Sequence, residues 1–169
     1  KNKYFDRVLT LKTQLGSIYH KLGHYENAEK CYLSALDFEE KIGKWQKHLL
    51  IQSYRELGIL YTRQKNWTKA QKMLKKAVNI SLEVEDIIAS IDSLWSLGNC
   101  FAKQKHFDKA IQTYLKAEEL LIKHNYPSKL RKIIISLGYC YKQVDNNEKY
   151  EYYKEKLFNE QELDWRDDM

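Results

Sequence analysis

The chain has 169 residues, 43% of them hydrophobic and 31% charged, which is enough apolar material for one ordinary domain or one short repeat array. The net charge of +6 comes mostly from lysines scattered among acidic residues. This distribution argues against nucleic-acid binding, because a surface that binds nucleic acid clusters its positive charge and favours arginine.

Three further features narrow the class of protein. One proline and 6 glycines are too few for the many turns of an all-β sandwich or barrel. No apolar run approaches the ~20 residues that span a bilayer, so we expect no membrane segment. Three cysteines without close pairing indicate no disulfide framework and favour a reducing, cytoplasmic location. The first residue is Lys rather than Met, so we expect a piece of a longer protein.

Taken in chain order, the apolar periodicity predicts eight helices, so the expected fold class is all-α. They span about 4–22, 25–42, 45–64, 67–84, 87–105, 107–124, 128–144 and 147–163. Gly43 and Pro127 mark connections between them. Neighbouring helices pair into four units, at about 9–42, 51–84, 91–124 and 131–163, and we expect these units to form a single array over residues 1–169.

A Leu-Gly pair recurs in every unit, with its glycines 42, 40 and 40 residues apart. An aromatic residue follows each glycine by three positions, and alanines follow the first three glycines by 12 and 19 positions. Glycine inside a helix costs about 1 kcal/mol relative to alanine, so four such glycines indicate close helix packing. Each unit is therefore predicted to be an antiparallel helix pair whose core is completed by stacking on its neighbours. The glycines are Gly16, Gly58, Gly98 and Gly138.

These residues resemble the tetratricopeptide repeat, whose pattern is Trp-x2-Leu-Gly-x2-Tyr, then Ala-x3-Phe, then Pro. The resemblance covers roughly residues 9–158. The closing proline is missing and the period is 40–42 instead of 34, which is typical of a long-period type with longer helices. The resemblance implies an α-α superhelix of about four stacked helical hairpins. Tyr150 and Leu157 replace the two alanines of the fourth unit, so we interpret the last helix as an atypical C-terminal cap.

The sequence contains no combination of residues that would build a catalytic or metal site. We therefore predict that the protein is not an enzyme and has no metal and no cofactor. Cys100 and Cys140 occupy a slot that holds Ile18 and Leu60 in the other units, which indicates core packing. A polar residue in the turn of each unit favours turn or capping chemistry over metal binding. These turn residues are His24, Asn66, His106 and Asn146.

The resemblance implies that the first helix of each pair lines a concave groove, where we expect function to lie. At about 100° per residue, the groove face is polar at one end and apolar with a basic rim toward the other. Trp95 is a natural anchor for a partner side chain, and packing against a neighbouring helix is the alternative. The predicted peptide-binding residues are Arg55, Ile59, Arg63, Trp95, Asn99, Lys103, Lys132, Ile135 and Tyr139.

The sequence thus predicts a non-catalytic domain that binds a peptide or protein segment in its groove, through an apolar anchor. Arg55, Arg63 and Lys103 favour an acidic segment. Two alternatives remain open. One is a peptide-pheromone-sensing regulatory domain, because the chain is similar to the sensing half of bacterial helix-turn-helix transcriptional regulators. The other is a structural module that self-assembles into a homo-oligomer through its exposed end helices.

Overall fold

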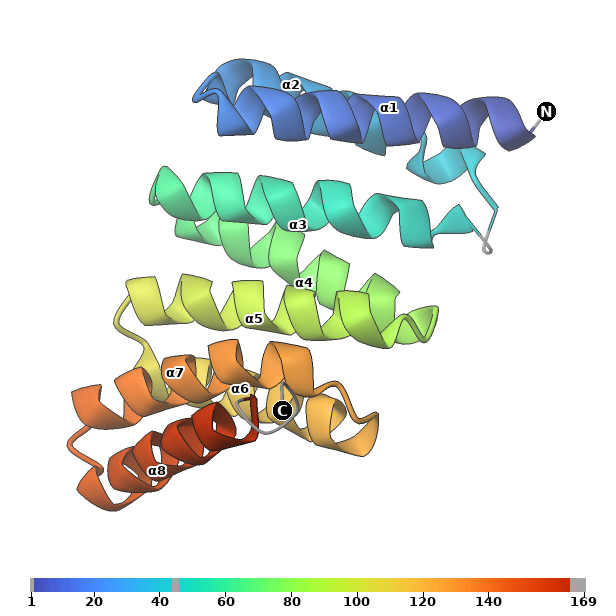
Figure 1. Ribbon diagram of the computed structural model, residues 1–169. Coiled ribbons are helices and arrows are strands. Elements are labelled where there is room, and N and C mark those ends of the chain that lie inside the picture. Colours follow the sequence, from blue (N-terminus) through green and yellow to red (C-terminus); the bar gives the residue numbers. More distant parts are fainter. Residues whose placement is uncertain (1, 44–45, 165–169) are drawn as a thin grey trace.

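The fold is an all-α superhelix of four stacked helical hairpins (Figure 1). The computed structural model describes residues 2–43 and 46–164, and these ranges contain no strand. The helices are α1 (Asn2–Lys21), α2 (Tyr25–Leu36), a short 3-10 helix η1 (Glu39–Lys41), α3 (His48–Arg63), α4 (Trp67–Glu83), α5 (Ile87–Lys103), α6 (Phe107–Lys123), α7 (Pro127–Gln143) and α8 (Asn147–Asp164). Among the described helices, none has both the length and the apolar character required to cross a lipid bilayer.

The hairpins α1–α2, α3–α4, α5–α6 and α7–α8 follow one another in a row, with α1–α2 and α7–α8 at opposite ends (Figure 1). Each second helix packs on its own first helix, and α2, α4 and α6 also pack on the first helix of the next hairpin. Successive first helices also touch one another, whereas the second helices meet one another much less. The row therefore curves so that α1, α3, α5 and α7 form its inner face and the second helices its outer face.

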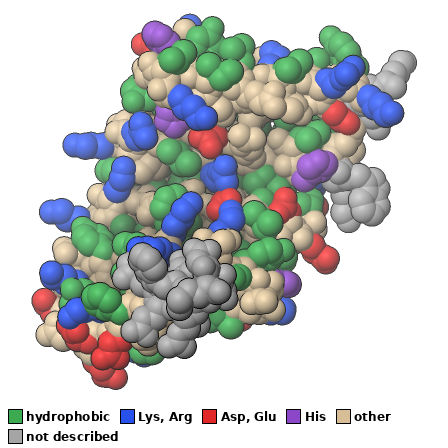
Figure 2. Space-filling model, viewed as in Figure 1, with side chains coloured by type: hydrophobic (Ala, Val, Ile, Leu, Met, Phe, Trp, Pro, Cys, Tyr) green, Lys and Arg blue, Asp and Glu red, His purple; other side chains and the backbone are tan. Residues whose placement is uncertain are grey.

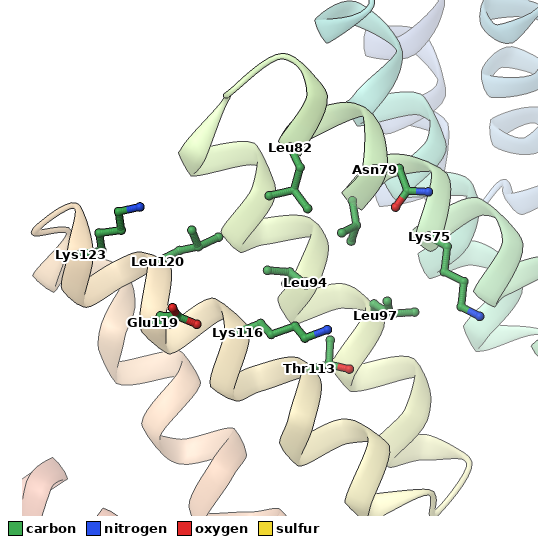
Figure 3. A pocket seen from close by; sticks show the side chains of 11 residues that line it. Lys75, Asn79, Leu82, Leu94, Leu97, Thr113, Lys116, Glu119, Leu120 and Lys123 are labelled. Carbon is green, nitrogen blue, oxygen red and sulfur yellow. The ribbon is translucent and has the colours of Figure 1, made fainter.

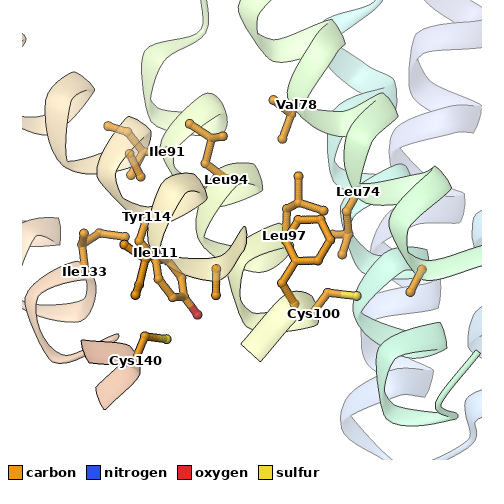
Figure 4. Close-up of a cluster of buried hydrophobic side chains, with 14 of the residues drawn as sticks. Leu74, Val78, Ile91, Leu94, Leu97, Cys100, Ile111, Tyr114, Ile133 and Cys140 are labelled. Atoms are coloured by element: carbon orange, nitrogen blue, oxygen red, sulfur yellow. The ribbon is translucent and has the colours of Figure 1, made fainter. Parts of the chain in front are cut away.

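A continuous core of buried side chains runs through the hairpins from α2 to α8. In Figure 4, Tyr114 of α6 lies beside Ile133 of α7, and Leu97 of α5 lies beside Leu74 of α4. Cys100 and Cys140 are completely buried in this core, which confirms their predicted packing role. Burial raises the pKa of the Cys140 thiol from 9.0 to about 11, so the thiol stays neutral in the folded protein.

The Leu-Gly glycines allow the two helices of a hairpin to approach closely, as the sequence predicted. A Cβ at Gly98 would lie 2.3 Å from the Tyr114 ring, and one at Gly58 would lie 2.4 Å from Leu74. Gly16 is in the same situation. Gly138 differs, because a Cβ there would meet its nearest neighbour, in α8, at an ordinary 3.7 Å. The last helix therefore packs less closely than the other second helices.

The turn inside each hairpin ends its first helix with a Schellman motif, in which a left-handed residue reverses the chain. In the second unit, the Asn66 N–H donates to the Tyr61 carbonyl oxygen at 2.9 Å, and Lys65 has a φ of 59°. This conformation is unfavourable for any residue with a Cβ. The equivalent positive-φ residues in the other units are Gly23, Lys105 and Asp145.

The predicted capping role of the turn residues is confirmed at two of the four positions. The side-chain oxygens of Asn66 and Asn146 accept hydrogen bonds from backbone N–H groups three residues later, at 3.3 and 3.0 Å. His24 and His106 occupy the same position but make no side-chain cap. Their helices start from the backbone geometry of the turn alone.

The helix α2 ends at Leu36, whereas the sequence predicted a helix up to about residue 42. The chain instead folds into η1 and turns back toward α1. This places the ring of Phe38 at 5.6 Å from that of Phe5, centroid to centroid, and packs Ile42 against a core cluster that includes Leu9. Burial of two apolar side chains, at about 25 cal/mol per Å² of apolar surface, favours this turn over a longer helix.

Candidate functional site

The inner face carries an apolar pocket of about 360 Å³ between α5 and α7, called here the α5–α7 pocket. Four of the nine predicted binding residues line it, so residues 32 to 40 positions apart in the sequence meet here. Ile135 and Tyr139 expose 51% and 53% of their surface, which is unusual for large hydrophobic residues. The full lining is Asn99, Ala102, Lys103, Tyr114, Ile135, Ser136 and Tyr139.

Hydrogen bonds and ring contacts fix the polar atoms of the α5–α7 pocket. The Tyr114 hydroxyl donates to the Asn99 side-chain oxygen at 2.6 Å. Burial raises the pKa of Tyr114 well above its usual value of 10.0, so this hydroxyl remains a donor. The Asn99 amide nitrogen has no partner among the described residues and is available to a ligand. The ring of Phe107 meets Tyr139 edge-on, with centroids 6.1 Å apart, and holds it at the pocket rim.

Trp95 lies beside this pocket, half-buried between α5 and α7. Its indole N–H donates to the Ser136 hydroxyl at 3.2 Å, and the Lys132 ammonium lies 5.5 Å from its ring centroid. These contacts favour the packing interpretation of Trp95, which forms a wall next to the pocket. The exposed apolar anchors on this face are Ile135 and Tyr139.

A second and more polar pocket, of about 700 Å³, lies between α1 and α3 on the same inner face. It contains Ile59 and Arg63 of the predicted set. Arg63 donates to the Tyr25 hydroxyl at 3.3 Å, and His20 Nδ1 lies 3.5 Å from a Glu56 carboxylate oxygen. The full lining of this α1–α3 pocket is Ser17, His20, Lys21, Leu22, Gly23, Tyr25, Gln52, Glu56, Ile59 and Arg63.

The sequence did not predict that His20 and Glu56 meet, although a signal was present. The slot of Glu56 holds Ser96 and Ser136 in the next two units, and the slot of His20 holds Thr62, Ala102 and Lys142 in the later units. This signal was weak, because Gln14 and Lys142 are also long side chains in these two slots. The Nε2 atom of His20 is buried and has no hydrogen-bond partner within the described chain.

The structure separates the predicted basic residues into paired and unpaired groups. The Arg55 guanidinium lies 3.5 Å from Asp92 and 3.4 Å from Glu56, so carboxylates neutralise much of its charge. Arg63 and Lys103 have no ion-pair partner in the part of the chain that is described. These two residues belong to different pockets, and each is free to attract a negative group on a ligand.

The outer face holds another hollow, of about 400 Å³, between the second helices α4 and α6 (Figure 3). Leu94 of α5 lies at its floor, and lysines from α4 and α6 stand at its rim. The sequence reasoning did not find this site, because only the divergence of the second helices opens it. Its rim lysines are Lys75, Lys116 and Lys123.

Basic side chains are spread over the inner face between hydrophobic patches, and acidic side chains gather at the end near α8 (Figure 2). The profile of a protein family described as "Tetratricopeptide repeat" matches residues 7–83 and 49–123, which is more than half of the chain. The chain belongs to the tetratricopeptide repeat (TPR) family. The stacked hairpins and the glycine-mediated packing of this TPR chain agree with the resemblance noted in the sequence.

Three solved structures share the TPR fold with this chain. BtubC (BKLC) from P. vanneervenii has a TM-score of 0.85 at 16% sequence identity, over 94% of this chain and 65% of that one. Aspartyl phosphate phosphatase F from Bacillus subtilis has a TM-score of 0.86 at 13% sequence identity, over 94% of this chain and 41% of that one. A Rap protein complexed with Competence and Sporulation Factor has a TM-score of 0.81 at 15% sequence identity, over 96% of this chain and 45% of that one. The chain spans less than two thirds of each of these proteins, and the likeness shows the fold alone.

Proposed function

We propose that this TPR array is a non-catalytic domain that binds an extended peptide or protein segment along its inner face. The observation that carries the proposal is the presence of two pockets on one face, an apolar one between α5 and α7 and a polar one between α1 and α3. First helices that pack side by side lie about 10 Å apart, and an extended segment advances roughly 3.3 Å per residue. A segment of about ten residues is therefore long enough to reach from one pocket to the other.

The side chains of the two pockets define the chemistry of the ligand. An aliphatic or aromatic side chain enters the α5–α7 pocket and contacts Ile135 and Tyr139, while the free amide nitrogen of Asn99 donates to a backbone carbonyl of the segment. Arg63 and Lys103 attract acidic residues on either side of this anchor. Arg55, which is already paired with Asp92, contributes less than the sequence predicted.

A second candidate function, sensing of a peptide signal, rests on one neighbour. The Rap protein whose structure was solved with Competence and Sporulation Factor shares this fold over 96% of the present chain. A sensor requires that ligand binding shift the array between two curvatures. The free thiols of Cys31, Cys100 and Cys140 support a reducing, cytoplasmic location for either function.

Selection of random peptides displayed on phage against the folded chain tests the proposal. Bound sequences are expected to share an apolar residue flanked by Asp or Glu. Ile135→Asp is expected to weaken binding of a selected peptide at least tenfold, measured by calorimetry. The matched control is Ile122→Asp, because Ile122 is similarly exposed but lies on α6 outside both inner pockets. Equal affinity of both variants, or peptides without an apolar position, would refute binding at this site.

A further inference from the structure

The helix α1 presents an apolar face that nothing covers within the described residues. Leu15 is 44% exposed, whereas Leu57 and Leu137, its equivalents in α3 and α7, are fully buried. In those units the second helix of the preceding hairpin covers the position. Hydrophobic side chains line the edge over α1 in Figure 2. The exposed members of this α1 face are Tyr4, Leu11, Leu15, Ile18 and Leu22.

At the opposite end of the array, α8 is a second helix against which no first helix packs within the described residues. Phe158 is 59% exposed, whereas Val78 and Glu118, which precede it by 80 and 40 residues, are 8% exposed each. Tyr152 is exposed on the same helix. Phe158 marks the α8 face, which is the surface that α4 and α6 bury against the next hairpin. Tyr152 lies outside this face, because its equivalents Lys72 and Gln112 are exposed within the array.

The unpaired charges beside the two faces are opposite. Lys154 of α8 is already paired with Glu151, at 2.8 Å, and Lys149 lies over the Tyr152 ring. Lys3, Arg7 and Lys21 are exposed on α1 and have no ion-pair partner in the described part of the chain. On α8, Glu148 and Glu155 are likewise exposed and unpaired. Pairing of α1 with a second α1 would bring like charges together, whereas pairing of α8 with α1 brings opposite charges together.

The contacts between hairpins within the chain give the register of such a pairing. The start of each second helix meets the end of the next first helix, as when Gln71 of α4 donates to Gln104, the C-cap residue of α5, at 3.0 Å. Glu151 lies 80 residues after Gln71, so the same arrangement places it near Lys21 at the end of α1. Val78 and Leu97 line one hollow between neighbouring hairpins, and their equivalents are Phe158 and Leu15.

We propose that the α8 face of one copy of this chain docks on the α1 face of a second copy and continues the superhelix head to tail. The exposed fractions of the five apolar residues of the α1 face add up to about three whole residues, or roughly 500 Å² if each is near the lower end of the aromatic range. This is most of the roughly 800 Å² that each partner contributes to a stable interface. The contact uses different surfaces on the two copies, so it forms open chains. It leaves the α5–α7 pocket accessible, whereas Lys21 and Leu22 are shared between the α1 face and the α1–α3 pocket.

Sedimentation velocity of the whole chain and of two variants tests the proposal. Leu15→Glu places an acidic group on the α1 face, and Phe158→Lys places a basic group on the α8 face. Both positions are exposed, and circular dichroism verifies that the variants are folded. The wild type is expected to exceed the mass of two chains at roughly 100 µM, while each variant alone stays near the 20.3 kDa monomer. An equimolar mixture of the two variants is expected to form a dimer and stop there, because each supplies the face that the other lacks.

Three results would overturn the proposal. The wild type could remain a monomer at this concentration, or the mixture of variants could remain monomeric. Phe158→Lys alone could still dimerise, which would indicate pairing of α1 with α1. Ile122→Lys is the matched control, since it adds a charge at an exposed isoleucine away from both end faces, and it is expected to assemble like the wild type.

Discussion

Replacement of Gly98 by alanine tests the close approach of α5 and α6. The new Cβ would lie 2.3 Å from Cε1 and 2.6 Å from Cδ1 of Tyr114, far inside van der Waals contact. The Tyr114 ring cannot move aside easily, because it is almost fully buried and its hydroxyl is bonded to Asn99. The substitution therefore forces a shift of the two helices or of the ring.

Three terms set the size of the effect. Overpacking of a well-packed core costs about 1–3 kcal/mol. Loss of the Tyr114–Asn99 hydrogen bond costs about 1 kcal/mol. The higher helix propensity of alanine returns about 1 kcal/mol. The free energy of unfolding of Gly98→Ala should thus fall by about 1–3 kcal/mol. The free energy of unfolding of Gly138→Ala should instead rise by up to about 1 kcal/mol, because the new Cβ meets nothing closer than 3.7 Å.

Urea titrations followed by far-UV circular dichroism measure both changes in the same protein. A second pair of variants isolates the cause: in a Tyr114→Ala background, Gly98→Ala should no longer destabilise, because the ring that it strikes is gone. If Gly98→Ala and Gly138→Ala stabilise the protein equally, the glycine does not serve close packing and the reasoning is wrong.

Three further predictions concern a turn, a thiol and an indole. Lys105→Gly should raise the free energy of unfolding by up to about 1 kcal/mol, because Lys105 has a φ of 61°, which glycine adopts without strain. Lys109→Gly in α6 should lower the free energy of unfolding by about as much, and chemical denaturation measures both changes. The pKa of the Cys140 thiol is about 11 in the folded protein and 9.0 as its ordinary value, so the free energy of unfolding should fall as the pH rises between these two values. If the free energy of unfolding of Cys140→Ala falls just as steeply with pH, the thiol is not the cause. Trp95→Phe should cost about 1 kcal/mol through loss of its bond to Ser136, and Ser136→Ala should add little in that background, as a double-mutant cycle by denaturation would show.

Much of the fold could be predicted from local sequence pattern. The helix pairs, the close packing at Gly58 and Gly98, and the burial of Cys100 all follow from side-chain periodicity and residue size, which act within one hairpin. The end of α2 was misplaced because its reason is not local. Phe38 leaves the helix to contact Phe5, a residue 33 positions earlier.

The candidate site was predicted in outline, and its electrostatics were not. Periodicity placed Asn99, Ile135 and Tyr139 on the inner face, where they line one pocket. It could not show that Asp92 neutralises Arg55, because that contact joins two different hairpins. The charge available to a ligand depends on such pairings between helices.

The sequence by itself determined that this chain forms repeated helical hairpins with closely packed partners, because the spacing of leucine, glycine and alanine specifies a helix face. Only the tertiary structure decided which of those faces are covered. Leu15 and Leu57 occupy the same slot of the same motif, yet one is 44% exposed and the other fully buried. The difference is the neighbouring second helix, and burial is a property of what packs against a residue as much as of the residue itself.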